Sequence, residues 1–298
     1  MGEKILLWHR LPVILGAGAL AGTALIGPAA GASAATGASA AAATAGASAA
    51  AATAGKGAAA GPVHRGTLPP GHPAASLPLD SSFLTSCGAG DDGIACNQLA
   101  LAAINHARRT LEKLGGMSFS LPAYQKLTPA QQLFVVVNLE RTERGLAPVV
   151  VLSRSLNAVA QAGARAGRDP AMASVPRRLP GGGWTVNAGA NWAGGFVNPL
   201  GADYEWMYDD GPGGSNLDCR TAASRLCWGH RDIVLTGSGG HASCSGGSVL
   251  AMGAGHAAAA AAGGYRESDT VLLAGVCGPA PTDAAFTWSK ARKLLHIS

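Results

Sequence analysis

The sequence predicts an α+β fold, in which helices from the first half of the folded region pack against strands from the second half. Apolar residues recur with helical spacing over residues 97–168, whereas residues 181–280 are rich in glycine and contain short apolar runs typical of strands. Helices and strands that are segregated along a chain in this way are typical of α+β domains. The stretch that begins at Asp80 is long enough for one domain with a hydrophobic core.

The residues before Asp80 are not expected to fold. Residues 1–34 begin with basic side chains, continue with an apolar run and end in small residues, which is the pattern of a secretory signal peptide. Residues 35–79 consist almost entirely of Ala, Gly, Ser, Thr and Pro, and Gly37–Ala45 recurs unchanged at Gly46–Ala54. Such a composition cannot build a core and predicts a flexible spacer. An uncleaved signal segment that anchors the chain in a membrane is the alternative interpretation.

Three helices are expected in the first half. The first covers residues 97–114 and is stopped by Gly115-Gly116. The second covers residues 128–145, because Thr128-Pro129-Ala130-Gln131 has the form of a capping box with proline at the first helical position. Its first half is apolar on all sides, which predicts a central position in the fold. The third runs from Ser153 or Ser155 to about Arg168, and its small inward-facing residues predict a close approach to a neighbouring element.

The second half predicts strands and disulfide bonds. Residues 249–253 and 270–276 are apolar runs of strand length, and residues 257–264 between them resemble a flexible hairpin connection. Six cysteines in a chain with a signal sequence indicate disulfide bonds. Short spacing predicts the pairs Cys87–Cys96 and Cys219–Cys227, and elimination leaves Cys244–Cys277. A zinc site is the competing interpretation, but the chain has no Cys-x-x-Cys pair.

The charge pattern does not predict a nucleic-acid partner. The formal net charge is +5, and the loss of residues 1–34, which contain Lys4, Arg10 and Glu3, leaves +4. The arginines are spread along the chain without interleaved aromatic residues, which is the pattern of a solvated face and not of a nucleic-acid interface.

Six short motifs follow one another in an order that resembles one family. They are Asn138-x-x-Arg141 with Gly145-Leu146-x-Pro148, Leu156-Asn157-Ala158 with Ala160-Gln161, Ala190-Asn191-Trp192-Ala193, Trp206-Met207, Gly229-His230-Arg231 and Met252-Gly253-Ala254-Gly255. This order resembles the CAP superfamily of secreted domains, and most of all its bacterial branch. The resemblance implies an α-β-α sandwich with a small three-stranded antiparallel sheet over residues 128–280. Residues 80–127 would then be a helical extension, and residues 281–298 a C-terminal tail.

The resemblance also implies a cleft with two histidines and two acidic residues that can hold a divalent metal ion. His230 matches the second histidine of that set, and Asp209 matches the second acidic residue. The position of the first acidic residue is Ala190, and no histidine occurs from residue 107 to residue 229. Zinc needs three or four protein ligands, so we expect no metal cofactor here and keep a divalent cation as a secondary expectation.

The expected cleft residues are Asn191, Glu205, Trp206, Asp209, His230 and Arg231. Within this set, His230 and Asp209 are the candidates for general acid–base catalysis by a hydrolase, because a neighbouring carboxylate can set the pKa and tautomer of an imidazole. No nucleophile is paired with them in the sequence. We therefore favour a structural hydrogen bond between His230 and Asp209 that braces the cleft.

The loop of residues 209–218 is a second candidate site. Its oxygen-bearing side chains, Asp209, Asp210, Asn216 and Asp218, are ligands that calcium prefers. The loop lacks the alternate-residue spacing of an EF-hand. A turn in which Asp and Asn side chains cap their own backbone is the favoured interpretation.

The sequence as a whole predicts a secreted CAP-like protein, extracellular or associated with the cell wall. The expected role is non-catalytic binding of a lipid or a cell-envelope component. The alternatives are a hydrolase that uses His230 with Asp209, and a structural module of the envelope without a ligand. The sequence gives no expectation for the oligomeric state.

Overall fold

The computed structural model describes residues 71–80, 83, 86–87, 93–195, 198–221, 223–236, 244, 247–258 and 267–297. All of them belong to one compact unit, Ala59–Ser298. The expected signal peptide, most of the spacer and the hairpin connection between the last two predicted strands lie outside the described residues. Within the described ranges, no helix combines the length and the apolar character needed to cross a bilayer.

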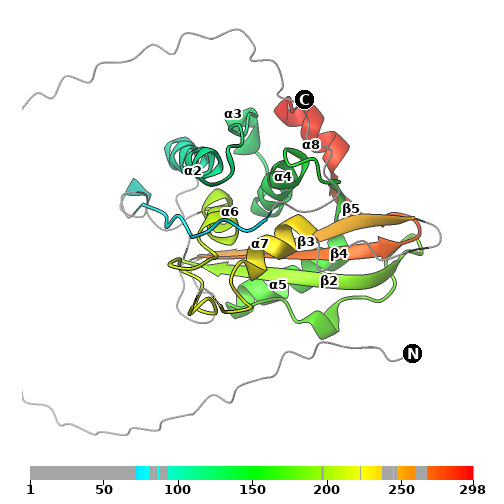
Figure 1. The fold of residues 1–298 in the computed structure, drawn as a ribbon. Helices are drawn as coiled ribbons and strands as arrows, with labels where there is room; N and C mark the ends of the chain where they lie inside the picture. The colour runs from blue at the N-terminus through cyan, green and yellow to red at the C-terminus, as the bar shows by residue number, and fades with distance from the viewer. Residues whose placement is uncertain are drawn as a thin grey trace, which may run out of the picture. The chain divides into compact units, whose positions relative to one another are not determined.

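Helices precede most of the strands along the chain, so the predicted α+β class is confirmed (Figure 1). The elements are α2 (Ile94–Ala107), α3 (Leu121–Tyr124), α4 (Pro129–Thr142), β1 (Val149–Ser153), α5 (Arg154–Ala166), β2 (Trp184–Gly194), α6 (Pro199–Tyr208), α7 (Gly229–Thr236), β3 (Ser248–Ala258), β4 (Glu267–Cys277), β5 (Ala284–Thr287) and α8 (Trp288–Leu295). A short π-helix, Arg108–Glu112, extends α2, and a 3₁₀ turn, Met172–Ser174, follows α5.

The sheet has five strands in the order β2-β4-β3-β1-β5, which corrects the expected three-stranded sheet. Strands β2, β4 and β3 pair antiparallel, as expected for the smaller sheet. Strand β1 then adds parallel to β3, and β5 adds antiparallel to β1. Both added strands are short, and a short apolar run carries little periodic signal of its own.

Residues 80–127 and 281–298 belong to the same domain as the rest. Tyr124 of α3 and Ile104 of α2 are wholly buried in the main core, together with residues of α4 and α6. The expected tail forms β5 and α8, and Thr287 caps α8 by accepting a hydrogen bond from the Lys290 N–H. Leu295 of α8 is also wholly buried. The described parts of these segments therefore contribute to the same core as α4 and α6.

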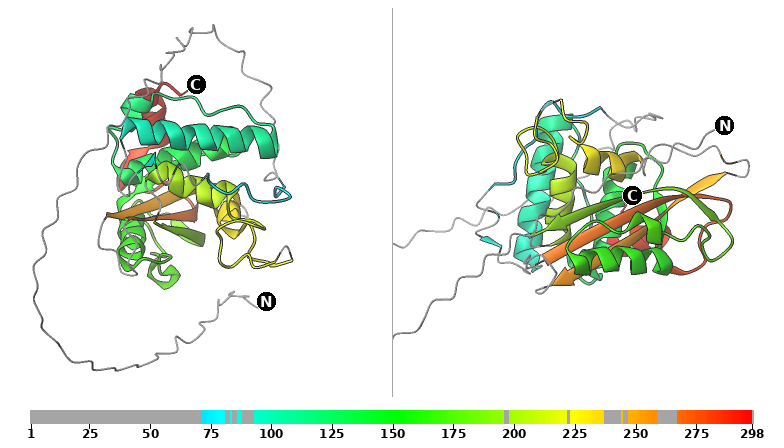
Figure 2. Two further views of the ribbon diagram at one scale, coloured as in Figure 1. Left: turned by 90° about the vertical axis from the view of Figure 1, so that its left-hand side faces the viewer. Right: turned by 90° about the horizontal axis from the view of Figure 1, so that it is seen from below.

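Helices cover both faces of the sheet (Figures 1 and 2). Helix α5 packs on one face against β3 and β4, and the apolar residues Leu156, Ala160 and Leu272 form the core there. Helices α4 and α6 lie on the other face, where Phe134 and Met207 belong to the main core. Helix α2 packs on the outside of α6.

The helix caps are those that the sequence predicts. Thr128 and Gln131 make both hydrogen bonds of the capping box at the start of α4, and Ser153 caps α5. The predicted close approach of the third helix is also present. A Cβ atom built on Gly255 of β3 would lie 2.5 Å from the Gln161 backbone of α5, and one on Gly253 would overlap the Leu156 carbonyl group.

All three predicted disulfide bonds are present: Cys87–Cys96, Cys219–Cys227 and Cys244–Cys277. Their Cα–Cα distances of 5.5, 4.5 and 5.5 Å are normal for disulfides. The third bond ties Cys244 to the last residue of β4. Such bonds are typical of proteins in oxidising compartments.

The Asn-x-x-Arg pair of α4 has a structural role. The Asn138 side chain accepts a hydrogen bond from the Val149 N–H at 2.7 Å and donates to the Val149 carbonyl, which fixes the start of β1. The Arg141 guanidinium donates to the Val234 and Leu235 carbonyls in the last turn of α7. A cation at this end of a helix also offsets the negative end of the helix dipole. The pair thus connects α4 to both β1 and α7.

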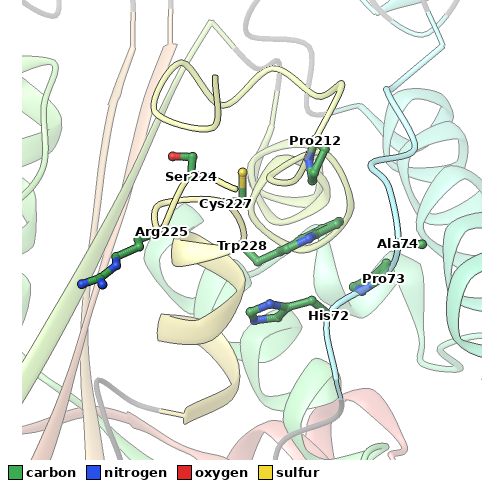
Figure 3. A pocket seen from close by; sticks show the side chains of 8 residues that line it. All are labelled: His72, Pro73, Ala74, Pro212, Ser224, Arg225, Cys227 and Trp228. Carbon is green, nitrogen blue, oxygen red and sulfur yellow. The ribbon is translucent and has the colours of Figure 1, made fainter. Parts of the chain in front are cut away.

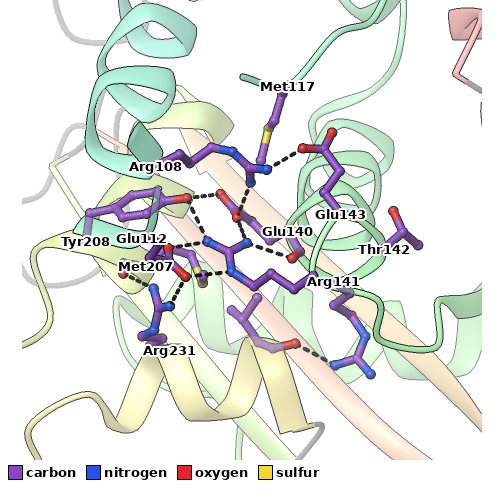
Figure 4. Close-up of polar contacts among 12 residues, drawn as sticks. Arg108, Glu112, Met117, Glu140, Arg141, Thr142, Glu143, Met207, Tyr208 and Arg231 are labelled. Atoms are coloured by element: carbon purple, nitrogen blue, oxygen red, sulfur yellow. Dashed lines mark hydrogen bonds and ion pairs between the residues drawn. The ribbon is translucent and has the colours of Figure 1, made fainter. Parts of the chain in front are cut away.

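A buried ionic network joins α4 to α6 and to the turn after α2 (Figure 4). Glu140 is fully buried and accepts hydrogen bonds from Arg108, Arg144 and the Tyr208 hydroxyl. Asp203 is also fully buried. Burial, followed by the charge of Glu140, raises the pKa of Asp203 well above its usual value.

The same network continues to α7. The Arg231 guanidinium donates to the Met207 carbonyl at 2.8 Å and to the Glu112 carboxylate at 2.6 Å, and Glu112 also pairs with Arg144. Burial opposes ionisation of Glu112, but the two arginines outweigh it and lower the pKa of this carboxyl to about 2. The network therefore fixes α7, which carries His230, against the helical layer.

Candidate functional site

His230 lies in the first turn of α7, and its imidazole is held by Asp210. Nδ1 of His230 lies 2.5 Å from Oδ1 of Asp210. The other carboxylate oxygen of Asp210 accepts the backbone N–H groups of His230 and Arg231 at 2.9 and 3.2 Å. Asn216 adds a fourth donor at 2.7 Å. The Asp210 carboxyl is thus held at the N-terminus of α7 and also orients the imidazole through Nδ1.

The expected partner of His230, Asp209, does not contact it. Helix α6 ends at Tyr208, and Asp209 is its C-cap residue, so the two consecutive acids diverge in direction. The backbone carbonyl of Asp209 accepts the Ser215 N–H, and its Oδ1 is buried without a hydrogen-bond partner. The spacing from Trp206 pointed to Asp209, but the structure assigns the contact to Asp210.

Two further carboxyl groups act on His230 electrostatically. They are Glu205 of α6 and Asp169, which follows α5. Burial raises the pKa of Glu205 to about 8, although the charge of His230 works against this rise. Asp169 is exposed to solvent as a residue, and the partial desolvation of its carboxyl raises its pKa. For His230, burial alone lowers the pKa, but the hydrogen bond to Asp210 and the three carboxyl charges outweigh it and raise the pKa.

Three of the expected cleft residues do not reach the surface. Trp206 is wholly buried in the main core, because α6 is covered by the sheet on one side and by α2 on the other. Arg231 is wholly buried in the ionic network. Asn191 is buried as well, and its side-chain amide donates to the His230 carbonyl at 2.9 Å, so it positions α7. Of the expected set, only Glu205 and His230 are partly exposed.

The acidic loop caps its own backbone, as the favoured interpretation predicted. Asn216 Nδ2 donates to the carbonyls of Asp210 and Leu226 at 3.1 and 3.2 Å, and Asn216 Oδ1 accepts the Asp218 N–H at 2.9 Å. Asp218 is exposed. The Asn216 amide and the Asp210 carboxylate therefore hold the loop and the start of α7 together.

One group of potential metal ligands converges in the described part of the chain. It is His256, Glu267 and Asp269, at the β3–β4 end of the sheet, and its ligand atoms lie within 4.8 Å of one another. The residues around His230 do not form such a group.

A surface hollow adjoins the start of α7 (Figure 3). Its volume is about 410 Å³, and its lining is His72, Pro73, Ala74, Pro212, Ser224, Arg225, Cys227 and Trp228. The segment before Asp80, expected to be a flexible spacer, forms one wall. His72 Nε2 lies 2.8 Å from the Asp232 carboxylate, and the Leu77 N–H donates to the Tyr208 carbonyl at 2.8 Å. The end of the predicted spacer is therefore packed on α6 and α7.

The arrangement provides a fixed imidazole among carboxyl groups, but it provides no nucleophile. Among the described residues, no serine, threonine or cysteine side chain is hydrogen-bonded to His230. The hydroxyl of Ser215 donates instead to Glu205 at 3.3 Å. A fixed imidazole and the carboxyl groups around it can donate and accept hydrogen bonds with a polar ligand.

Sequence reasoning missed Asp169 and gave Asp210 no role at His230. No spacing in the sequence connects Asp169 to His230, so Asp169 gave no usable signal. The signal for Asp210 was its place after the helix that contains Trp206. An acid that follows a helix end can turn towards a second helix N-terminus, which is a preferred position for a carboxylate.

We expect Glu205→Gln to make the protein more stable at pH 8 and to leave its stability at pH 4.5 nearly unchanged. The carboxyl has a pKa of 4.5 when unfolded and about 8 when folded, so the folded state loses stability as the pH rises between these values. The amide cannot ionise, and the gain at pH 8 should reach up to about 4 kcal/mol. Unfolding by urea across this pH range measures it.

The control for this prediction is Asp218→Asn, because Asp218 is exposed. That variant should follow the wild-type pH profile. If Glu205→Gln and the wild type show parallel pH profiles, Glu205 does not keep its proton in the folded state.

Comparisons of this chain with protein-family models, with characterised proteins and with solved structures find no match.

Proposed function

We propose that the chain is an exported, CAP-like binding module without catalytic activity, and that its ligand is a polar component of the cell envelope. The order of the sequence motifs supports the family. The helices on both faces of the sheet and the antiparallel β2-β4-β3 core are the layers that this resemblance implies. The three disulfide bonds support export into an oxidising compartment.

The arrangement around His230 carries the proposal. Asp210 holds the imidazole with one oxygen and the N-terminus of α7 with the other, so the ring is fixed in one orientation. Glu205, which is partly buried, and Asp169, which is exposed, present carboxyl groups whose desolvation raises their pKa values. These groups are hydrogen-bond partners for hydroxyl, amide or ammonium groups of a ligand.

A hydrolase and a lipid-binding module have less support than a module that binds a polar ligand. A hydrolase that uses His230 needs a nucleophile or a positioned water, and the Ser215 hydroxyl of the neighbouring loop is bonded to Glu205. A lipid needs a deep apolar cavity, and the hollow beside Trp228 includes the charged and hydroxyl-bearing residues Arg225 and Ser224 in its lining.

Co-sedimentation with purified peptidoglycan sacculi tests the proposal. The full chain, expressed with export, should sediment with the sacculi, and His230→Ala should weaken binding at least tenfold because it removes the oriented imidazole. His106→Ala is the matched control, because His106 is an exposed histidine of α2. It should bind like the wild type.

Three results would contradict the proposal. Equal binding by His230→Ala and the wild type would remove His230 from the site. Soluble fragments released by the wild type but not by His230→Ala would establish a hydrolase. Binding to phosphatidylglycerol vesicles without binding to sacculi would establish a lipid ligand.

A further inference from the structure

The antiparallel pairing of β3 and β4 places three potential metal ligands on one face of the sheet. His256 is directly opposite Asp269, and Glu267 is opposite Ala258, the second residue after His256. Alternate residues of a strand share a face, so His256, Asp269 and Glu267 point to the same side. Backbone register alone therefore brings one imidazole and two carboxylates together near the end of the β3–β4 pair.

The distances between the ligand atoms suit one bound ion. Nδ1 of His256 lies 2.9 Å from Oδ1 of Asp269 and 3.5 Å from Oε1 of Glu267. Nitrogen and oxygen ligands bind Zn²⁺ at about 2.1 Å, so two of them in tetrahedral or octahedral geometry lie roughly 3.0–3.4 Å apart. Shifts of a few tenths of an ångström would allow all three atoms to reach one ion.

The ligand-bearing backbone is held in place from both sides. The Gln161 amide of α5 donates to the His256 carbonyl at 2.7 Å, and its oxygen accepts the His256 N–H at 3.2 Å. The Gly195 N–H donates to the Glu267 carbonyl at 2.8 Å. On the β2 side, the neighbour of Asp269 is Ala193, whose small side chain leaves room beside the carboxylate. A rigid ligand set of this kind loses little entropy when it binds an ion.

The burial of the group also favours a cation. Asp269 and Glu267 are only 1% and 3% exposed. Two carboxylates that leave water together are costly, and a divalent cation removes that cost by neutralising both. The His256 side chain is 22% exposed, which provides an entry path for the ion.

We propose that His256, Glu267 and Asp269 form a binding site for a divalent first-row metal ion of the size of Zn²⁺. The ligands are Nδ1 of His256 and one oxygen from each carboxylate. Imidazole together with carboxylates suits Zn²⁺ better than the oxygen-only sets that Ca²⁺ and Mg²⁺ prefer. Three protein ligands leave at least one coordination position for water or another ligand. This metal site is separate from His230 and the carboxyl groups around it at the start of α7. It does not depend on the function proposed for them.

Zinc titration of the full chain tests the site. The protein is expressed with export, stripped with EDTA, dialysed, and titrated with Zn²⁺ in competition with a chromophoric chelator. We expect one equivalent to bind in the micromolar range or tighter. His256→Ala and the near-isosteric Asp269→Asn should each weaken binding at least 100-fold. His230→Ala is the control, because His230 is also partly buried and paired with a carboxylate but lies outside the metal site. It should bind Zn²⁺ like the wild type.

X-ray absorption at the zinc edge and thermal unfolding give independent readouts. The bound ion should show nitrogen and oxygen ligands at about 2.0–2.1 Å and no sulfur. Saturating Zn²⁺ should raise the Tm of the wild type and leave that of Asp269→Asn unchanged, which separates loss of the site from loss of folding. The proposal is overturned if the wild type binds no stoichiometric Zn²⁺, if binding survives His256→Ala, or if binding is lost in His230→Ala instead.

Discussion

Replacing Glu140 with glutamine should destabilise the protein by about 3–5 kcal/mol. Its carboxylate is fully buried and is shared by the guanidinium groups of Arg108 and Arg144, which are themselves buried. The amide keeps the shape of the side chain but removes the charge. The network then holds more buried positive than negative charge, and removal of one partner from a buried ion pair costs more than the pair contributes. Urea unfolding at pH 7 measures the loss.

Glu143 provides the matched control. It pairs with Arg108 as well, but its side chain is 29% exposed, so water can replace the interaction. We expect Glu143→Gln to cost less than about 1 kcal/mol. Equal losses in Glu140→Gln and Glu143→Gln would show that burial does not decide the energetics of this network.

The Asp203→Asn variant tests whether the Asp203 carboxyl carries a proton in the folded protein. Burial and the nearby charge of Glu140 raise the pKa of Asp203 well above its usual value, so we expect its carboxyl to carry a proton in the folded protein. An amide is uncharged and has nearly the same shape as a protonated carboxyl, so this variant should cost about 1 kcal/mol or less. A loss as large as that of Glu140→Gln would mean that Asp203 is ionised.

The elements that the sequence predicts well are those whose signals are local. The capping box at Thr128 and the cap at Ser153 are contained within four residues, and both helices begin where these signals lie. The short cysteine spacings are local in the same sense. By contrast, β1 and β5 become strands only by pairing with each other, more than 130 residues apart, and β1 also with β3. A run of four or five residues does not carry that information.

The site could be predicted only in part, for a related reason. The sequence motif identifies His230, but which of two consecutive acids meets it depends on where α6 ends. Asp169 acts electrostatically on His230 from a segment about 60 residues earlier in the chain. No spacing rule connects the two residues. The group at His256 is different, because alternation along two paired strands determines it. Its prediction required strands longer than the apolar runs alone indicate.

Replacing Gly253 with alanine should destabilise the protein by about 3 kcal/mol, although the same change normally stabilises a strand. Alanine restricts the unfolded chain, and that effect alone would stabilise the folded state by about 0.4–1 kcal/mol. At Gly253, however, the added methyl group would overlap the backbone of Leu156 in α5. A side chain can rotate away from an added methyl group, but backbone atoms cannot. Helix α5 must therefore move away from β3, and overpacking of this kind costs about 1–3 kcal/mol or more.

Gly115→Ala separates the two effects. Gly115 is exposed, and a methyl group there would meet no atom within 4 Å, so only the unfolded-state effect remains and the variant should be slightly more stable than the wild type. Opposite signs for Gly253→Ala and Gly115→Ala in urea unfolding would locate the cost in the contact between α5 and β3. If both variants gain stability, helix α5 can move away from β3 at this contact without a large cost. The Asn157 side chain, which accepts the Ala254 N–H at 2.9 Å, would then have to shift with α5.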